Sequence, residues 1–248
     1  ALIKTHPHSP GDFFATEAAG LAWLAASETL PVPAVLAVDT DCLIVRWVES
    51  GKPSGDAAAT FGAGLARLHA SGVGPGQADG FGAKNDGYIG TLRLPNQQRA
   101  SWAEFYAEFR VRPYLALSVD RGAIEPADAA VIEKVVGRIG DWVPEEPPAR
   151  LHGDLWNGNV LWNLEGSASV IDPAAYAGHR ETDLAMLALF GLPHLSRTFD
   201  AYEAEHPLAE GWMDRLGLHQ LFPLLVHAAR FGGGYGPRAA TVARRFAS

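Results

Sequence analysis

The sequence predicts an α+β protein of two lobes, in which a small β-rich N-lobe precedes a larger and mainly helical C-lobe. Three observations support this prediction. Short β-prone runs lie before residue 49, apolar residues at helical spacing dominate after residue 55, and a segment rich in Gly, Pro and Ser separates the two regions. We therefore assign residues 1–48 to the N-lobe and residues 49–248 to the C-lobe.

The N-lobe is expected to contain one helix and three strands. Apolar residues from Phe14 to Ala26 recur at helical spacing, and this helix ends before Pro31 because proline cannot continue it. Two β-branched runs flank the polar segment Asp39–Asp41, which predicts a hairpin. The expected elements are a strand at 1–5, a helix at 14–26 and strands at 34–38 and 43–48.

The C-lobe is expected to be helical except around two strands, each of which meets a polar turn. Segment 71–97 is rich in glycine and predicts a long irregular loop, which in compact domains is usually functional. The predicted strands are 151–164 and 169–172. The predicted helices are 56–70, 101–117, 126–142, 184–190, 198–205, 216–231 and 238–246.

Composition and charge exclude several classes of protein. The chain has 248 residues, of which 48% are hydrophobic, and 20 Lys and Arg against 28 Asp and Glu give a net charge of −8. Without a run of basic residues, it lacks the positive surface that nucleic-acid binding requires. No apolar stretch reaches the roughly 20 residues of a membrane span. Because Cys42 is the only cysteine, we expect a protein of the reducing cytoplasm. From the charge and the apolar stretches, we expect that it binds neither nucleic acid nor membrane. The sequence specifies no oligomeric state.

The strongest chemical motif is His152-Gly-Asp-Leu-Trp-Asn-Gly-Asn159, followed by Asp172 in Val170-Ile-Asp-Pro173. A single Asp or Asn in a turn commonly binds only its own backbone. Here, however, the order Asp, Asn, Asp across a strand pair matches the catalytic loop and metal-binding Asp of kinases. In that arrangement Asp154 accepts or orients the proton of the attacking hydroxyl. Asn159 and Asp172 would hold Mg²⁺ against the phosphates of ATP, since Mg²⁺ prefers oxygen ligands.

Beyond this general pattern, the sequence resembles the fructosamine kinase (ketosamine-3-kinase) family, a protein kinase-like group related to aminoglycoside phosphotransferases. Trp156 and the run Gly178-His-Arg-Glu181 distinguish this family from aminoglycoside and choline kinases, which share only the His-Gly-Asp and later Asp pattern. The resemblance extends from about Leu2 to the C-terminus. The segments that carry it are 152–159, 171–173, 178–186 and 87–96, with Trp102 and Phe105-Tyr106.

The resemblance implies ATP-dependent phosphorylation of the 3-hydroxyl of a ketosamine, the adduct of a sugar with an amine or a protein lysine. It also implies that Lys4 pairs with the α- and β-phosphates and that Glu17 holds Lys4. The residues agree, because Lys4 lies in a β-prone run and Glu17 in the helix that follows. An isolated Lys–Glu pair is otherwise a surface contact worth about 0–1 kcal/mol.

Two further groups of residues are expected to contact the substrates. Residues 45–49 occupy the place of a kinase hinge, where adenine would bind the carbonyl of Arg46 and the N–H of Val48; the alternative is simply the end of a strand. Trp156 is expected to face the acceptor, because its ring can stack on a sugar. His179 and Arg180 are expected either to line the acceptor pocket or only to brace the metal-binding strand.

Several histidines invite a zinc site, but His152, His179 and His194 lack metalloprotease spacing. We expect His152 to hold the catalytic loop through backbone hydrogen bonds. Asp183 is expected to cap the helix at Leu184 and to tie it to that loop.

Two alternative functions remain open at this point. An aminoglycoside- or choline-type kinase is one, with the acidic stretch 202–210 supplying an anionic acceptor wall. A catalytically inactive pseudokinase is the other, because only three residues precede Lys4 and the Gly-rich hairpin over the phosphates is missing. We expect that the N-lobe is truncated before the Lys strand. The presence of Lys4, Glu17, Asp154, Asn159 and Asp172 argues against a pseudokinase.

Overall fold

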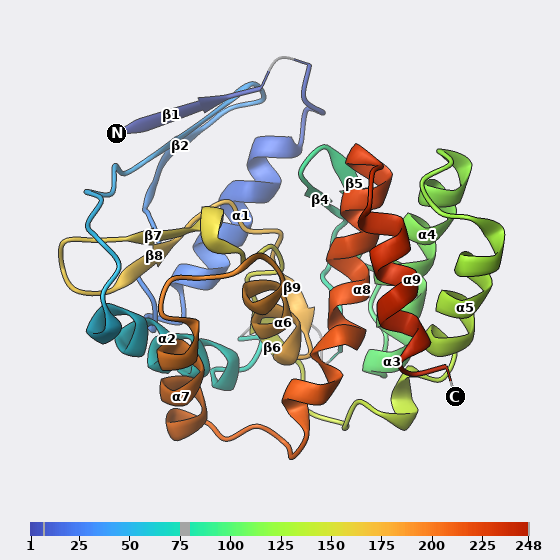
Figure 1. The fold of residues 1–248 in the computed structure, drawn as a ribbon. Helices are drawn as coiled ribbons and strands as arrows, with labels where there is room; N and C mark the ends of the chain where they lie inside the picture. Colours follow the sequence, from blue (N-terminus) through green and yellow to red (C-terminus); the bar gives the residue numbers. More distant parts are fainter. Residues whose placement is uncertain (7, 75–79, 248) are drawn as a thin grey trace.

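The computed structural model describes residues 1–6, 8–74 and 80–247 of the chain, and it has the predicted two-lobe α+β architecture (Figure 1). In the N-lobe, a three-stranded antiparallel sheet has the order β1-β3-β2. Helix α1 packs on it, and its Phe14 and Leu21 are buried with Leu43 of the sheet. The elements are β1 (Leu2–Thr5), α1 (Phe13–Ala25), β2 (Val35–Val38) and β3 (Cys42–Val45).

These N-lobe elements confirm the predicted strand, helix and hairpin. The hairpin turn closes where Asp39 N–H donates to the carbonyl of Cys42 at 2.9 Å. Lys4 pairs with Leu43 in the β1–β3 register, so the lysine lies on the strand at one edge of the sheet.

The C-lobe helices form two groups. Helices α4, α5, α8 and α9 lie together on the side away from the N-lobe, whereas α2 packs against α7 below the sheet (Figure 1). The helix predicted at 126–142 ends at Val136 and a short 3₁₀ turn follows, while the one predicted at 101–117 contains a π-helical stretch. The bounds are α2 (Gly55–Ala70), α3 (Trp102–Phe105), π-helix (Tyr106–Val111), α4 (Arg112–Asp120), α5 (Pro126–Val136), 3₁₀ turn (Ile139–Asp141), α6 (Glu181–Phe190), α7 (Leu195–Glu205), α8 (Trp212–Phe231) and α9 (Tyr235–Arg244).

Three short two-stranded ladders complete the C-lobe and correct the strand predictions. The segment predicted as an irregular loop, 71–97, contains the β4–β5 hairpin; its residues 75–79 lie outside the described residues. The strand predicted at 151–164 is two strands, because the catalytic loop interrupts it. The ladders are β4 (Gly87–Ile89) with β5 (Leu92–Leu94), β6 (Ala149–Leu151) with β9 (Tyr176–Gly178), and β7 (Val160–Trp162) with β8 (Ala168–Val170).

The order of these ladders brings two functional loops together. The β6–β7 loop carries residues 152–159, and the β8–β9 loop carries residues 171–175. Backbone hydrogen bonds tie the loops to each other, from Ile171 N–H to the carbonyl of Asn159 at 3.1 Å and from Ala174 N–H to that of His152 at 3.0 Å. The buried helices beneath both loops supply a rigid base. None of the described helices is long and apolar enough to cross a membrane.

Candidate active site

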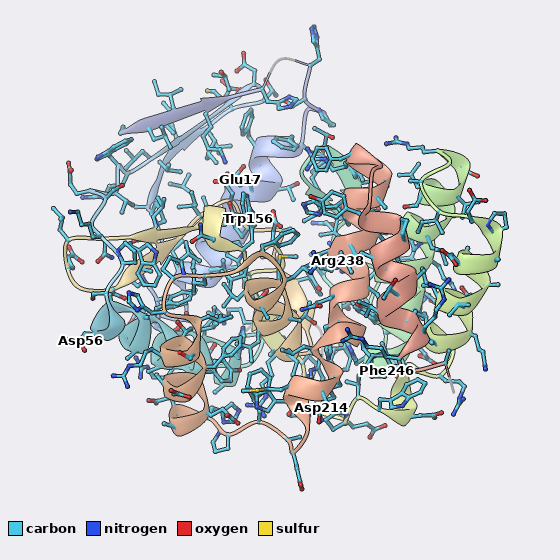
Figure 2. All side chains as sticks on the ribbon, viewed as in Figure 1. Glu17, Asp56, Trp156, Asp214, Arg238 and Phe246 are labelled. Atoms are coloured by element: carbon cyan, nitrogen blue, oxygen red, sulfur yellow. The ribbon has the colours of Figure 1, made fainter. Side chains whose placement is uncertain are left out.

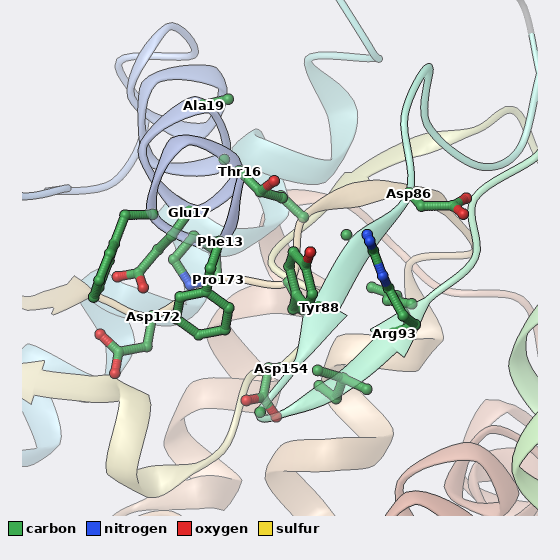
Figure 3. Close-up of a pocket in the computed structure, with 18 of the residues that line it drawn as sticks. Phe13, Thr16, Glu17, Ala19, Asp86, Tyr88, Arg93, Asp154, Asp172 and Pro173 are labelled. Carbon is green, nitrogen blue, oxygen red and sulfur yellow. The ribbon is translucent and has the colours of Figure 1, made fainter. Parts of the chain in front are cut away.

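Two adjoining cavities open beside these loops. The larger, of about 1100 Å³, lies between the N-lobe, the catalytic loop, the β4–β5 hairpin and the end of α8; the smaller, of about 260 Å³, lies under the N-lobe sheet. Lys4, Glu17 and Asp172 line both cavities. Figure 2 shows Glu17 and Trp156 in the region between the lobes, and Figure 3 shows Asp154 and Asp172 facing the larger cavity from the two loops.

The catalytic loop is held by buried polar contacts. The carboxylate of Asp183 accepts the backbone N–H groups of His152 at 2.8 Å and Gly153 at 3.0 Å. The His152 ring bonds the carbonyl of Ile171 through Nε2 at 2.8 Å and receives Asp154 N–H at Nδ1. The structure therefore confirms that His152 and Asp183 hold this loop, but the predicted capping role of Asp183 is wrong. Helix α6 begins at Glu181, Asp183 lies inside its first turn, and no described side chain caps this end of the helix.

Asp154 lies at the floor of the larger cavity beside Asn159. The Asn159 amide Nδ2 donates to the backbone carbonyl of Asp154 at 2.8 Å and to its Oδ2 at 3.3 Å. Burial raises the pKa of Asp154 to about 6, with the hydrogen bond from Asn159 acting in the opposite direction. A carboxylate with this pKa is ionised at neutral pH yet close enough to titration to accept a proton, which suits a general base.

Lys4 joins the N-lobe to the β8–β9 loop, which carries Asp172. Its Nζ lies 2.5 Å from Glu17 Oε1 and 2.9 Å from Asp172 Oδ1. Although burial lowers the pKa of Lys4, its bonds to Asp172 and Glu17 outweigh this effect and raise the pKa above its usual value. The lysine is therefore a fixed positive charge where the two cavities meet.

The residues present fit a magnesium ion. Asn159 uses its Nδ2 on Asp154, so its Oδ1 is left to face a cation, and Asp172 uses one carboxylate oxygen on Lys4 and keeps the other. Asp172 has a left-handed backbone with φ of 55°, which is uncommon for a residue other than glycine and is often found at functional sites. Hard oxygen donors of this kind are the ligands that Mg²⁺ takes in proteins.

The smaller cavity is mostly apolar and has a charged end. Arg46 and Val48 line it next to Trp47, as the hinge position predicts. Lys4 and Asp172 stand at its opening into the larger cavity. An apolar slot with a cation at its mouth matches a nucleotide, whose base is planar and whose phosphates are anionic.

Trp156 lies in the larger cavity, with 41% of its surface exposed. Its ring rests over Gly158, where an added Cβ would come within 2.3 Å of the indole. Its other neighbour is Phe190, at a centroid distance of 6.2 Å in an edge-to-face arrangement. The ring is thus supported from behind and leaves a face toward the cavity.

His179 and Arg180 lie elsewhere. Neither side chain lines the larger cavity, and both are buried. Arg180 makes a two-pronged ion pair with Glu146, at 2.7 and 2.8 Å, while the His179 ring stacks on His219 at 5.1 Å. Neither of the two expectations describes this placement: the side chains do not line the cavity, and Arg180 joins segments of the C-lobe rather than the metal-binding strand.

A buried cluster of His179, Glu181 and His219 brings three ligand-type side chains within 4.8 Å of one another. Arg215, however, holds both carboxylate oxygens of Glu181 at 2.6 to 3.1 Å. Burial raises the pKa of Glu181, but its bonds to His219 and Arg215 outweigh this and lower it to about 2. Because a cation here would face the guanidinium, the cluster is a structural ion pair.

Sequence reasoning missed the cavity wall that the start of α1 and the β4–β5 hairpin form. Tyr88 and Arg93 lie on the β4–β5 hairpin (Figure 3). Both bind Asp12 at the start of α1, and all three residues line the larger cavity. Burial and the bond to Asp12 raise the pKa of Tyr88 to about 12. The apolar residues on both sides of Gly90-Thr91 were an available hairpin signal. Arg230, from the end of α8, was also missed.

Comparisons with known proteins show what the chain is similar to. A family model described as fructosamine kinase matches residues 1–247. A probable ketoamine kinase of Synechocystis sp. is 36% identical over 243 residues, which cover 96% of this chain and 80% of that protein.

Several solved protein structures are also similar to the structure of this chain. The "putative fructosamine-3-kinase" of Thermobifida fusca has a TM-score of 0.92 at 50% identity, covering 98% of this chain and 83% of that one. Its counterpart from Haemophilus somnus has a TM-score of 0.84 at 26% identity, with coverages of 98% and 82%. An aminoglycoside phosphotransferase bound to gentamicin has a TM-score of 0.63 at 13% identity, with coverages of 98% and 84%, and this likeness shows the fold alone.

Proposed function

Because the chain belongs to the fructosamine kinase family, we propose that it transfers the γ-phosphoryl group of ATP to a sugar hydroxyl of a ketosamine, the 3-hydroxyl. One observation carries this proposal beyond family membership. Lys4, Asp154, Asn159 and Asp172, which come from three separate segments, line a single cavity. This is the set that phosphoryl transfer requires, because the reaction depends on positioning and on neutralising charge.

The two cavities bind different parts of the substrates. Adenine enters the smaller cavity, where backbone groups of Arg46 and Val48 bind its edge and apolar side chains cover its faces. The phosphates then pass Lys4 and reach the larger cavity. The acceptor enters the larger cavity from the opposite side, with its sugar against Trp156 and its hydroxyl at Asp154.

In the transfer step, the acceptor oxygen forms a bond to the γ-phosphorus while the bond from that phosphorus to the leaving ADP oxygen breaks. The hydroxyl proton passes to the carboxylate of Asp154, which Asn159 holds in place. Lys4 binds the phosphates and Glu17 fixes Lys4. Mg²⁺ held by Asn159 and Asp172 would supply further neutralisation of phosphate charge.

The test is a coupled ADP-release assay with ATP and Mg²⁺, run with a ketosamine, with an aminoglycoside and without acceptor, and with ³¹P NMR of the product. ADP release that requires the ketosamine, together with a phosphate ester on its sugar, supports the proposal. Asp154→Ala and Asp172→Ala should each reduce turnover by orders of magnitude while the far-UV circular dichroism spectrum is unchanged. Activity close to wild type in either variant, or a preference for the aminoglycoside, would contradict it.

The alternative of an aminoglycoside kinase is not favoured. The acidic stretch 202–210, which would have supplied the anionic wall, does not line either cavity. Its helix α7 packs against α2 instead, and the carbonyls of His206 and Pro207 bind Arg180.

A further inference from the structure

The part of the larger cavity that the acceptor would enter has an aromatic wall. Trp156 of the catalytic loop, with His227 and Phe231 near the end of α8, lines this part. Phe190 lies behind the wall, 4.8 Å from the ring of His227, and His227 lies 5.5 Å from that of Phe231. The wall suits a sugar and a short organic chain, but it contains no fixed charge.

Arg230 adds a cation beside this wall. It is exposed at the end of α8, it lines the larger cavity, and its guanidinium lies 4.8 Å from the ring centre of Phe231. It also lies against Gly90, in the turn of the β4–β5 hairpin, where φ is +56°. An added Cβ at Gly90 would come within 2.1 Å of Arg230 Nη1. The glycine therefore leaves the space that the guanidinium takes.

The charge of Arg230 is not used within the described part of the protein. Lys4 is paired with Glu17 and Asp172, and Arg93 is paired with Asp12, whereas Arg230 forms no ion pair or hydrogen bond with the described residues. Lys84 is the other such cation that lines the cavity. Arg230 also acts on Asp154: burial raises the pKa of Asp154, and the positive charge of Arg230 opposes that rise.

We infer that Arg230 and the aromatic wall form a carboxylate-binding subsite, so that the preferred acceptor is a ketosamine whose amine part carries a free carboxylate. This inference rests on the proposed kinase function. The sugar hydroxyl lies at Asp154 and its ring at Trp156, while the amine part extends along the wall to Arg230. A guanidinium binds a carboxylate through two parallel hydrogen bonds, which a neutral amide cannot reproduce.

A role for Arg230 on the nucleotide is the competing explanation. The smaller cavity meets the larger at Lys4, Glu17 and Asp172, whereas Arg230 lines only the larger cavity and belongs to α8 of the C-lobe. Lys4 already provides the cation at the junction. The two explanations differ in a measurable way, because an arginine that bound phosphate would affect every acceptor equally.

The experiment compares the fructose adducts of β-alanine and of β-alanine amide, which differ only in the terminal charge. We expect wild-type protein to show a kcat/KM at least about tenfold higher for the carboxylate at saturating ATP. Arg230→Gln should bring this ratio close to one without changing the KM for ATP, and Arg230→Lys should restore part of it. Lys84→Gln is the matched control and should leave the ratio unchanged.

Each other outcome overturns the inference. Equal phosphorylation of both adducts by wild-type protein would do so while leaving the proposed function intact. A loss of kcat in Arg230→Gln that is equal for both adducts would assign the arginine to phosphate, and a loss of the ratio in Lys84→Gln would assign the carboxylate to Lys84. Phosphorylation of neither adduct would remove the proposed function together with the inference. Thermal unfolding of each variant shows whether the fold is retained.

Discussion

Asp154→Asn is expected to stabilise the folded protein at neutral pH while it removes activity. Burial raises the pKa of Asp154 from 3.8 to about 6. Between these two values the folded state binds more protons at Asp154 than the unfolded state does. The contribution of this residue to stability is therefore present below about pH 4 and is lost as the pH rises through about 6.

The size of the effect follows from the same pKa values. A tenfold difference in proton affinity is worth about 1.4 kcal/mol, so a rise from 3.8 to about 6 corresponds to about 3 kcal/mol. Asparagine has the same shape, can still accept the Asn159 bond and never ionises. The unfolding free energy of Asp154→Asn minus that of wild type should thus increase by about 3 kcal/mol between about pH 3 and about pH 7.5.

Urea unfolding without nucleotide, followed by tryptophan fluorescence, measures this difference. Asp41→Asn, in the exposed β2–β3 turn, controls for the general effect of removing a negative charge. In Asp154→Asn, kcat should fall by a factor of about 10² to 10⁴, the usual contribution of a general base. For wild type, kcat/KM should decline below about pH 6 as Asp154 becomes protonated. A stability difference that does not change with pH would refute the argument that burial dominates at Asp154.

Three further predictions concern the loop around this residue. Asp183→Ala leaves two buried backbone N–H groups without an acceptor and should lower the unfolding free energy by about 3 kcal/mol or more in urea unfolding; a smaller loss would mean that water replaces the carboxylate. Gly153→Ala should cost more than about 2 kcal/mol, because φ is +80° and the new Cβ would come within 2.1 Å of the carbonyl of Ala174. Gly166→Ala, with a similar φ and open space, should cost only about 1 kcal/mol. Trp156→Ala should raise the KM for the ketosamine severalfold and leave that for ATP nearly unchanged, and the reverse result would remove Trp156 from the acceptor site.

The N-lobe and most helices could be predicted because their signals are local. Helix α1 begins and ends within one residue of the prediction, since apolar spacing and the prolines beyond it define both ends. Strand β9, in contrast, has only three residues and shows no alternation. Its pairing with β6 depends on a contact between segments about 27 residues apart, which no local pattern indicates.

The site residues show the same difference between local signals and contacts made by distant segments. Asp154, Asn159 and Asp172 could be predicted because their order along the chain reflects one continuous loop–hairpin–loop unit. His179 and Arg180 are adjacent to that unit in sequence, but the backbone turns at the start of α6 and directs them into the C-lobe, where Arg180 meets Glu146. Arg230 lies 76 positions beyond Asp154 and reaches the cavity only because α8 ends there. Only the tertiary structure reveals such contributions.

The arrangement of the reacting groups depends on backbone ties more than on contacts between their side chains. Asp172 is held in a left-handed backbone conformation, and the proline that follows disfavours the right-handed α-helical conformation at this residue. Its neighbour Ile171 is fixed on both sides, because its N–H binds the carbonyl of Asn159 and its carbonyl binds the ring of His152. The strain at Asp172 is therefore maintained by the same two loops that carry the other reacting residues. Loosening either loop would release Asp172 and displace Asp154 together, so the proposed general base and the proposed metal ligand form a single structural unit.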